Sequence, residues 1–465
     1  MKKILLTSIL IIFHLHINAQ DGNLDTSFDP DIILNSVVNT SAIQDDGKII
    51  LGGHFESISS SGKNRIVRLN LDGTVDNSFN IGGGFDNIVR AISIQEDGKI
   101  LVGGEFSSYN GSNVYRIARL NINGTLDTSF NAGILDGTIH CILILENGKI
   151  VVGGNFLELN ANIVNHIARL NADGSIDQTF NSGSGFDTNT NNVMSFSIQT
   201  DGKIIVGGNF SSYNGSNVNR IARLNADGSL DPNFISGAGF NSVVRTTSIQ
   251  NDGKILVGGA FSYYNNFRNE KIIRLNIDGS IDTSFNLGEG FDNDVWTISI
   301  QNDYKIIVGG DFSEFSNTGI KNIARLNSDG VLDNSFNSVF ILGGSIRTTQ
   351  IQNDGKIIIG GEFHLNNGVE RNRIARLNST TLGTSNINLE AQVKLYPNPT
   401  TEKIMFNVPQ ELIGKTLTIT NTSGQIMKQK TITQSDFSID FGSYINGVYF
   451  LNTNSGRIIK KIIKQ

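Results

Sequence analysis

The feature that most constrains this chain of 465 residues is a motif repeated seven times. In the second copy, Ile94–Phe106, it reads Ile-Gln-Glu-Asp-Gly-Lys-Ile-Leu-Val-Gly-Gly-Glu-Phe. The lysine of the motif recurs at Lys48, Lys99, Lys149, Lys203, Lys254, Lys305 and Lys356. Because successive copies begin 50 to 54 residues apart, the chain is expected to build one array of similar units that pack against their neighbours.

Each repeat predicts four short strands and no helix. In the second unit the expected strands are 89–95, 99–106, 116–121 and 126–130. Tight Asp-Gly or Asn-Gly turns separate the first strand from the second and the third from the fourth, since glycine accepts a positive φ without steric cost. Four strands in about 50 residues, repeated along the chain, indicate an all-β fold, a seven-bladed β-propeller of four-stranded antiparallel blades.

The two ends of the array complete one unit between them. A block of the form Asp-Gly-x-Leu-Asp-x-x-Phe follows the third strand in six units and is missing from the seventh. The missing copy stands at the start of the array, at Asp21–Phe28. We therefore expect the N-terminal segment to supply the outer strand of the last blade and to close the ring, which would leave no open sheet edge there.

The first residues and the composition indicate an exported protein. Residues 1–20 combine Lys2 and Lys3 with an apolar run and a small residue at Ala19, as signal peptides do. The run is too short to span a bilayer, so we expect no transmembrane segment in the mature chain. A net charge of −6 provides no basic surface for nucleic acid, and the single cysteine, Cys141, excludes an intramolecular disulfide framework.

The repeat resembles a known family. Asp-Gly-Lys-Ile with a following Gly-Gly-x-Phe, and then Arg-Ile-Ala-Arg-Leu-Asn-x-Asp-Gly-Ser/Thr-Leu-Asp-x-Ser-Phe, is similar to the delta-60 repeat of bacterial surface and secreted proteins. The resemblance covers residues 21–378 and departs from the pattern locally, where Tyr304 replaces a turn glycine and Asn147 a turn aspartate. It implies a propeller-like fold, but no settled activity and no motif-defined catalytic residue.

A different unit follows the repeats. Residues 379–392 are polar and predict a linker, and residues 393–465 alternate like the strands of a small β-sandwich. Tyr396–Pro399, Gly447–Leu451 and the basic end Lys460–Lys464 resemble the C-terminal sorting domain of the type IX secretion system. The resemblance implies that this unit engages the secretion machinery of a Gram-negative bacterium, which places the chain outside the cell or on its outer surface. A fibronectin-like accessory domain is the alternative.

Residues that recur in all seven units are interpreted as framework. If the Asp-Gly turn is a three-residue loop, Arg68 on the third strand lies opposite Asp76, which predicts a bidentate ion pair in every blade. The oxygen-bearing residues of 70–76 also permit a calcium loop, although they supply few ligands and a turn explains them equally well. The sequence contains no zinc motif, phosphate loop or Ser-His-Asp set, so we expect no cofactor and no metal site.

Two positions vary between the units inside this framework. One opens the first strand and the other follows Gly-Gly, and both are expected at the mouth of the central channel, on the face with the longer loops. A two-residue first hairpin would place them opposite each other, whereas a three-residue loop would offset them by one. Their mixed charges suit a polar ligand such as a glycan or a peptide, although blade-specific packing and local ion pairs also explain them. The candidates are Arg90, Glu105, His140, Arg245, Trp296, Asp311, Arg347 and Glu362, with Tyr109, Tyr213 and Tyr264 in the longer loops.

These observations favour a secreted or surface-anchored propeller that binds a glycan or a protein without catalysis. The second hypothesis is an extracellular carbohydrate-active enzyme with Glu105, Asp311 and Glu362 as acid and base. It requires two carboxylates about 5–10 Å apart that are not tied to neighbouring arginines. The third hypothesis is a structural component of the cell-surface layer.

Overall fold

In the computed structural model the described residues form strands and turns but no α-helix, so they contain no helix that could cross a membrane. The structure describes residues 21–30, 34–56, 65–187, 193–336, 341–366, 370–379, 393–408, 412–413, 416–421, 425–453 and 458–465. The chain divides into two compact units, Met1–Thr381 and Leu382–Gln465. The expected signal peptide, residues 1–20, and residues 380–392 of the expected linker lie outside the described residues.

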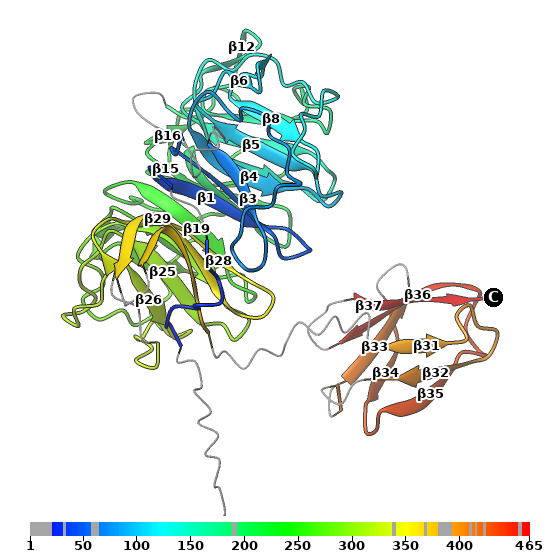
Figure 1. Cartoon of the computed structure of the whole chain (residues 1–465). Helices are drawn as coiled ribbons and strands as arrows, with labels where there is room; N and C mark the ends of the chain where they lie inside the picture. The colour runs from blue at the N-terminus through cyan, green and yellow to red at the C-terminus, as the bar shows by residue number, and fades with distance from the viewer. Residues whose placement is uncertain are drawn as a thin grey trace, which may run out of the picture. The chain divides into compact units, whose positions relative to one another are not determined.

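The first unit contains one antiparallel sheet for each repeat, in which the second strand pairs with the first and the third (Figure 1). The first strands are β1 (Val38–Ile43), β4 (Val89–Ile94), β9 (Ile139–Ile144), β14 (Val193–Ile198), β19 (Val244–Ile249), β24 (Val295–Ile300) and β28 (Ile346–Ile351). The second strands are β2 (Ile49–Gly53), β5 (Ile100–Gly104), β10 (Ile150–Gly154), β15 (Ile204–Gly208), β20 (Ile255–Gly259), β25 (Ile306–Gly310) and β29 (Ile357–Asn366). The third strands are β3 (Ile66–Leu69), β8 (Ile117–Leu120), β13 (Ile167–Leu170), β18 (Ile221–Leu224), β23 (Ile272–Leu275), β26 (Ile323–Leu326) and β30 (Glu370–Leu377).

Short hairpins follow the second strand in four of the repeats, within the loops that lead to the third strand. They are β6 (Ser108–Tyr109) with β7 (Ser112–Asn113), β11 (Glu158–Leu159) with β12 (Asn162–Ile163), β16 (Ser212–Tyr213) with β17 (Ser216–Asn217), and β21 (Tyr263–Tyr264) with β22 (Phe267–Arg268). In the seventh sheet β27 (Ile341–Leu342) pairs with the far end of the long strand β29.

The prediction of a fourth strand in every blade is wrong. At its expected position in the second unit the structure has a single antiparallel bridge, between Leu120 and Leu126, and the other units repeat this pattern. The chain turns away because Asp127 Oδ1 accepts hydrogen bonds from both the backbone N–H and the hydroxyl of Ser129. An aspartate that binds the backbone two residues ahead favours a turn over an extended strand. The first six blades are therefore three-stranded, and the seventh sheet has β27 as a fourth strand at a different position.

The first strands of neighbouring blades pack against one another. The order of contact is β1, β4, β9, β14, β19, β24 and β28, and β28 in turn contacts β1. The first glycine of each Gly-Gly pair permits this packing. A Cβ on Gly52 would lie 2.4 Å from a methyl group of Val89 in the next blade, and one on Gly360 would lie 2.8 Å from Val38. The last and first blades thus meet through the same kind of contact as the others.

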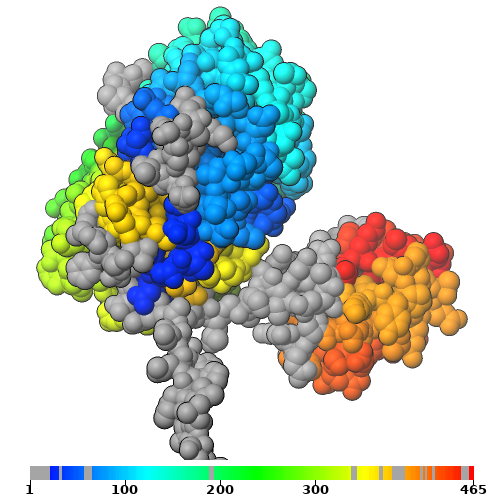
Figure 2. Space-filling model, viewed as in Figure 1, coloured from blue at the N-terminus to red at the C-terminus, as the bar shows by residue number. Residues whose placement is uncertain are grey.

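The N-terminal segment pairs with the last blade. Leu24 bridges to Leu377, and the backbone N–H of Asp25 donates to the carbonyl of Arg376. Figure 2 shows the same proximity, with blue N-terminal residues directly beside yellow residues of the last blade. These contacts pair the segment around Leu24 with the third strand of the last blade, β30.

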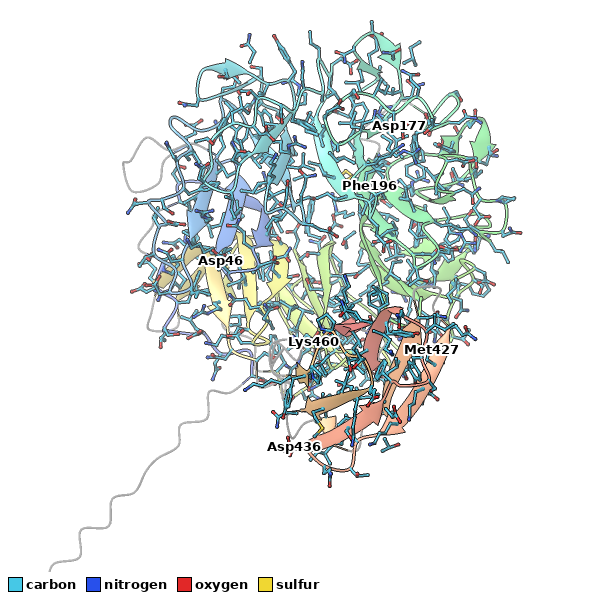
Figure 3. All side chains as sticks on the ribbon, turned by 90° about the vertical axis from the view of Figure 1, so that its right-hand side faces the viewer. Asp46, Asp177, Phe196, Met427, Asp436 and Lys460 are labelled. Atoms are coloured by element: carbon cyan, nitrogen blue, oxygen red, sulfur yellow. The ribbon has the colours of Figure 1, made fainter. Side chains whose placement is uncertain are left out.

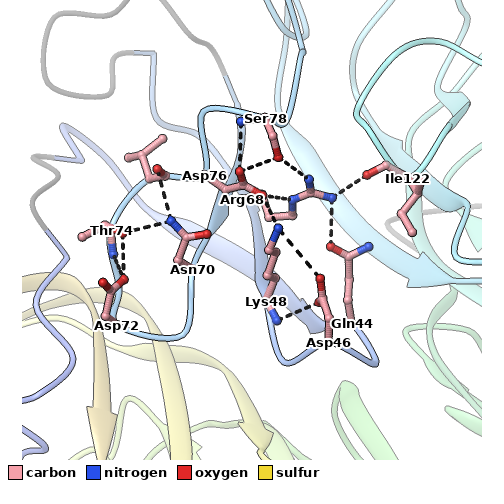
Figure 4. A network of polar contacts seen from close by, with 11 residues as sticks. Gln44, Asp46, Lys48, Arg68, Asn70, Asp72, Thr74, Asp76, Ser78 and Ile122 are labelled. Carbon is pink, nitrogen blue, oxygen red and sulfur yellow. Dashed lines mark hydrogen bonds and ion pairs between the residues drawn. The ribbon is translucent and has the colours of Figure 1, made fainter.

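A buried ion-pair network recurs in all seven blades and is drawn for the first blade in Figure 4. Arg68 Nε and Lys48 Nζ both donate to Asp76 Oδ2, at 2.8 and 2.9 Å, while Ser78 binds the other oxygen. The predicted pairing of Arg68 with Asp76 is confirmed, but it is neither bidentate nor between two strands, because Arg68 reaches the carboxylate through Nε alone and Asp76 lies outside the strands. Burial alone would raise the pKa of Asp76, but hydrogen bonds from Ser78, Lys48 and Arg68 hold it well below its ordinary value. Arg68 Nη1 also binds the carbonyl of Ile122, which links neighbouring blades.

The hairpin between the first two strands of each blade has a three-residue loop. In the second unit Gln95 N–H donates to the carbonyl of Lys99, and Gly98 has a φ of 78°. Six units place glycine at this position of positive φ, whereas the sixth unit places Tyr304 there with a φ of 68°. A tyrosine in this conformation is strained, because its Cβ approaches the backbone.

Replacing Tyr304 with glycine is expected to stabilise the first unit by about 1 kcal/mol, since glycine adopts this conformation without steric cost. The side chain is half exposed, so its loss removes little packing. Urea unfolding can be followed through the fluorescence of Trp296, the single tryptophan of the chain. Tyr304→Ala removes the ring but keeps the strained φ and should bring no gain. A glycine variant that unfolds at lower urea than the alanine variant would contradict this account.

The second unit contains two antiparallel sheets that share one apolar core. One sheet has the order β31 (Lys394–Tyr396), β32 (Lys403–Asn407), β35 (Asp436–Asp440), and the other has the order β34 (Ile426–Thr431), β33 (Thr416–Asn421), β36 (Gly447–Thr453), β37 (Ile458–Lys464). The rings of Phe406 and Phe437 stack in the core with centroids 4.9 Å apart. Figure 3 shows the side chains of both units and labels Met427 and Asp436 in this one. Two sheets around one core give the sandwich expected from the alternating sequence.

Candidate functional site

The variable position at the start of the first strand is a β-bulge in every blade. In the second blade Val89 pairs with Gly104 and Ala91 pairs with Gly103, so Arg90 is an extra residue between the two pairs. A bulge interrupts the ladder and redirects the extra side chain. The equivalent residues in the other blades are Asn39, His140, Met194, Arg245, Trp296 and Arg347. Because the first strands are neighbours, these side chains all lie at the same end of the ring of strands.

The second variable position is held directly beside the bulge. A Cβ on Gly104 would lie 2.1 Å from the carbonyl oxygen of Ile88, so only glycine permits the close approach of the two strands. The backbone N–H of the next residue, Glu105, donates to that same carbonyl at 2.9 Å. The hairpin has the three-residue loop, one of the two alternatives considered, and the register places Glu105 beside Ile88 and not directly opposite Arg90.

Three candidate residues form a stack that crosses three blades. The guanidinium carbon of Arg245 lies 3.6 Å from the ring centroid of Trp296, and that of Arg347 lies at the same distance. Two guanidinium groups cannot occupy the same place over one face of a ring, so they cover opposite faces of the indole. Such contacts are attractive cation–π interactions. They also close both faces of Trp296 to stacking by a ligand.

Two members of this stack are bound by carboxylates. Arg245 donates to Asp294 Oδ2 through Nε at 2.9 Å and through Nη2 at 2.6 Å. Trp296 Nε1 donates to Asp311 Oδ2 at 2.8 Å. Asp294 was not among the predicted site residues. The signal that could have found it is the presence of a carboxylate where other units have an uncharged residue such as Ile88.

Arg90 and Glu105 form a closed ion pair. Arg90 Nε and Nη2 donate to Glu105 Oε1 at 2.7 and 2.5 Å. The side chain of the neighbouring His140 is partly buried. Burial lowers its pKa to about 4; Arg90 lowers it as well, while Glu105 opposes the change. The imidazole is therefore neutral near pH 7. Its Nε2 atom is buried and makes no hydrogen bond in the part of the chain that the structure describes.

Arg347 and Glu362 form an open pair. Arg347 Nη2 lies 3.9 Å from Glu362 Oε2, which is beyond hydrogen-bond distance. Within the described ranges neither side chain makes a hydrogen bond. The Glu362 side chain is 50% exposed. Burial lowers the pKa of Arg347, although the charges of Asp311 and Glu362 act in the opposite direction.

The three tyrosines predicted as loop candidates are buried. Tyr109, Tyr213 and Tyr264 are at most 1% exposed. The ring of Tyr109 lies 4.5 Å from that of Phe85, and its hydroxyl donates to the carbonyl of Gly124; the other two tyrosines make equivalent contacts. Each hydroxyl finds a backbone acceptor inside the blade, so these residues anchor the loops and are not presented to a ligand.

The turn considered as a calcium loop is occupied by its own hydrogen bonds. Asp72 Oδ1 accepts from both the backbone N–H and the hydroxyl of Thr74, and Asp76 binds Arg68 and Lys48. Among the residues that the structure describes, no group of three or more histidine, cysteine, aspartate or glutamate side chains is arranged to hold a metal ion.

Two known families match the chain. Residues 44–79, 95–130, 145–180, 199–234, 250–285, 301–336 and 352–380 match the β-propeller domain of unknown function DUF5122, and together they cover more than half of the chain. Residues 394–465 match the secretion system C-terminal sorting domain. The second match confirms the type IX sorting domain expected from the sequence.

The individual proteins that resemble this chain share less than a third of their residues with it over the aligned part. β-Agarase A of Zobellia galactanivorans is 29% identical over 124 residues, which are 24% of this chain and 22% of the agarase. The chain thus spans about a fifth of the length of this curated relative. The WD40 propeller domain of Doa1 superposes with a TM-score of 0.48 at 14% identity, over 78% of this chain and 96% of that one. PorZ, a surface component of the type IX secretion system of Porphyromonas gingivalis, superposes with a TM-score of 0.41 at 13% identity, over 92% and 59%. None of these similarities identifies a ligand.

Proposed function

We propose that this chain, which belongs to the DUF5122 β-propeller family, is a binding protein for an extracellular glycan. Its type IX sorting domain directs secretion to the cell surface or to the extracellular space. Neither matched family assigns an activity to the propeller, so the ligand has to be inferred from the residues that the ring of blades brings together.

The observation that carries the proposal is the bulge that every blade places at the same end of its first strand. The surrounding framework is the same in all blades, yet the bulged residue is asparagine, arginine, histidine, methionine or tryptophan. Variable side chains on a rigid scaffold are typical of binding sites. The arginines and carboxylates expected at the mouth of the central channel supply the donors and acceptors with which proteins bind hydroxyl groups. A protein ligand uses the same polar groups and is the other outcome of the test below.

The enzyme hypothesis has less support than the binding hypothesis. Glycoside hydrolysis needs two carboxylates that can act as acid and as base or nucleophile. Glu105 accepts hydrogen bonds from Arg90, and Asp311 accepts a hydrogen bond from Trp296. Of the three predicted carboxylates, only Glu362 is without a hydrogen bond in the described part of the chain. No specific contact favours a purely structural role in the surface layer.

In a glycan array probed with the full mature chain, Trp296→Ala and Arg347→Ala are each expected to weaken binding about tenfold or more, because each dismantles the stack at the mouth. Tyr304→Ala is the matched control, since it lies at the opposite, hairpin end of the blade that carries Trp296. Full retention of glycan binding by both mouth variants would exclude the mouth as the site. Binding to a parallel peptide array and to no glycan would exclude a glycan ligand.

A further inference from the structure

Blades 2 and 7 carry the same two residue types at the mouth, but the two pairs differ in geometry. In blade 2 Arg90 makes two hydrogen bonds to Glu105, at 2.7 and 2.5 Å. In blade 7 the equivalent Arg347 stays 3.9 Å from Glu362 and makes no hydrogen bond with the described residues. Because the backbone register of the two blades is the same, the difference comes from the neighbouring side chains.

Trp296 accounts for the open pair. The guanidinium carbon of Arg347 lies 3.6 Å from the centroid of this indole ring, and the group does not bind Glu362. The indole is itself fixed, because Asp311 accepts its N–H and Arg245, tied to Asp294, covers the other face. The blades on either side of Arg90 provide asparagine and histidine at the bulge, and Arg90 makes no such stack among the described residues. The stack therefore holds the cation of Arg347 away from its own carboxylate.

The open pair presents donors and an acceptor side by side. A guanidinium has five N–H donors and no acceptor, and a carboxylate only accepts. Arg347 and Glu362 are both without hydrogen bonds to described residues, so both have free capacity for a ligand. A group that fits both must accept from the arginine and donate to the glutamate. Two neighbouring hydroxyls of a sugar do this without net charge, whereas a carboxylate or sulfate would satisfy Arg347 but be repelled by Glu362.

We propose that Arg347 and Glu362 recognise a pair of neighbouring hydroxyls on an uncharged sugar, and that Trp296 is a positioning residue that keeps the pair open. The inference rests on the proposed function and narrows its ligand to a neutral glycan. It also assigns Trp296 a role other than stacking on the sugar, since both faces of its ring are covered.

The single tryptophan of the chain provides the measurement, because Trp296 touches Arg347 directly. The full mature chain is titrated with neutral oligosaccharides and with oligosaccharides that carry uronate or sulfate groups, while tryptophan emission is recorded. A neutral oligosaccharide is expected to give a saturable change. Arg347→Met and Glu362→Gln should each weaken its binding about tenfold or more, since each leaves one sugar hydroxyl unpaired. Arg90→Met and Glu105→Gln make the matched changes at the closed pair and should weaken binding less than the changes at Arg347 and Glu362 do. Tyr304→Ala, at the opposite, hairpin end of a blade, should leave binding unchanged.

The role of Trp296 is tested by calorimetry, which does not depend on its fluorescence. Trp296→Phe keeps an aromatic face for Arg347 and should retain more of the affinity than Trp296→Leu, at comparable unfolding midpoints. Equal affinities of these two variants would overturn the positioning role.

Three results would overturn the recognition proposal, and they have different meanings. A neutral sugar that binds Arg347→Met and Glu362→Gln as tightly as the wild type would leave the proposed function intact but refute this site. A preference for acidic sugars, strengthened by Glu362→Gln, would show that the ligand is an anion. Binding of no sugar in either the array or the titration would refute the proposed function as well.

Discussion

Gly104→Ala is expected to lower the stability of the first unit by about 3 kcal/mol or more. The added Cβ would lie 2.1 Å from the carbonyl oxygen of Ile88, which is a backbone atom and cannot rotate away. That carbonyl also accepts the N–H of Glu105 at 2.9 Å, so the two strands cannot separate without breaking the contact that holds the mouth residue. Overpacking of a closed interior costs about 1–3 kcal/mol, and loss of a hydrogen bond adds about 1 kcal/mol.

Gly83→Ala is the matched control for this substitution. Nothing lies within 4 Å of a Cβ at Gly83, so the change should stay within about 1 kcal/mol of the wild type. Urea unfolding followed by Trp296 fluorescence measures both variants. If Gly104→Ala does not fold, Gly103→Ala provides a second case, because its Cβ would lie 2.6 Å from a methyl group of the buried Ile139, which is a side-chain atom and not a backbone atom. A wild-type midpoint for Gly104→Ala would contradict the close approach of the strands at the bulge.

The repeated parts of the fold could be predicted because the chain contains seven versions of the same unit. Comparison among them separates the recurring Arg68 and Asp76 from the varying Arg90 and Glu105, which distinguishes framework from candidate site. The count of complete units also indicated that the segment around Asp25 pairs with the last blade. These inferences need only spacing and residue type, and the sequence contains both.

Features that depend on neighbours across blades could not be predicted in the same way. The stack of Arg245, Trp296 and Arg347 joins three repeats, and a comparison of equivalent positions cannot show that their side chains reach one another. The bulge is a shift in strand register, which leaves Arg90 between the pairs Val89–Gly104 and Ala91–Gly103, and residue types alone do not show where such a shift falls. The burial of Tyr109 depends on its contact with the ring of Phe85, and the order of residues does not show that these two side chains meet.

Asp25→Ala is expected to release the N-terminal segment from the last blade. Asp25 Oδ2 accepts hydrogen bonds from Arg376 Nε at 2.7 Å and from Lys356 Nζ at 2.8 Å. Removing one partner of a buried ion pair costs about 3–5 kcal/mol, because the remaining charges lose their compensation. The same segment buries Phe28 completely against the first blade, so its release also exposes apolar surface where the first and last blades meet.

Asp127→Ala is the matched control, since Asp127 has the same partners, Arg119 and Lys99, within one continuous unit. Both variants should unfold at lower urea, but only Asp25→Ala should speed hydrogen exchange at the amides of Gly22 and Asp25, which bond to the last blade. A segment joined to its partner through eight residues stays close after losing the contact, whereas Asp25 is separated from Arg376 by 351 residues. Because Asp25 and Asp127 have the same kinds of partner, the difference in hydrogen exchange between the two variants has one source. It measures how strongly a short chain connection keeps the aspartate segment next to its strand. Unchanged exchange at Gly22 and Asp25 in the Asp25→Ala variant would show that the junction of the two ends is no weaker than any other blade.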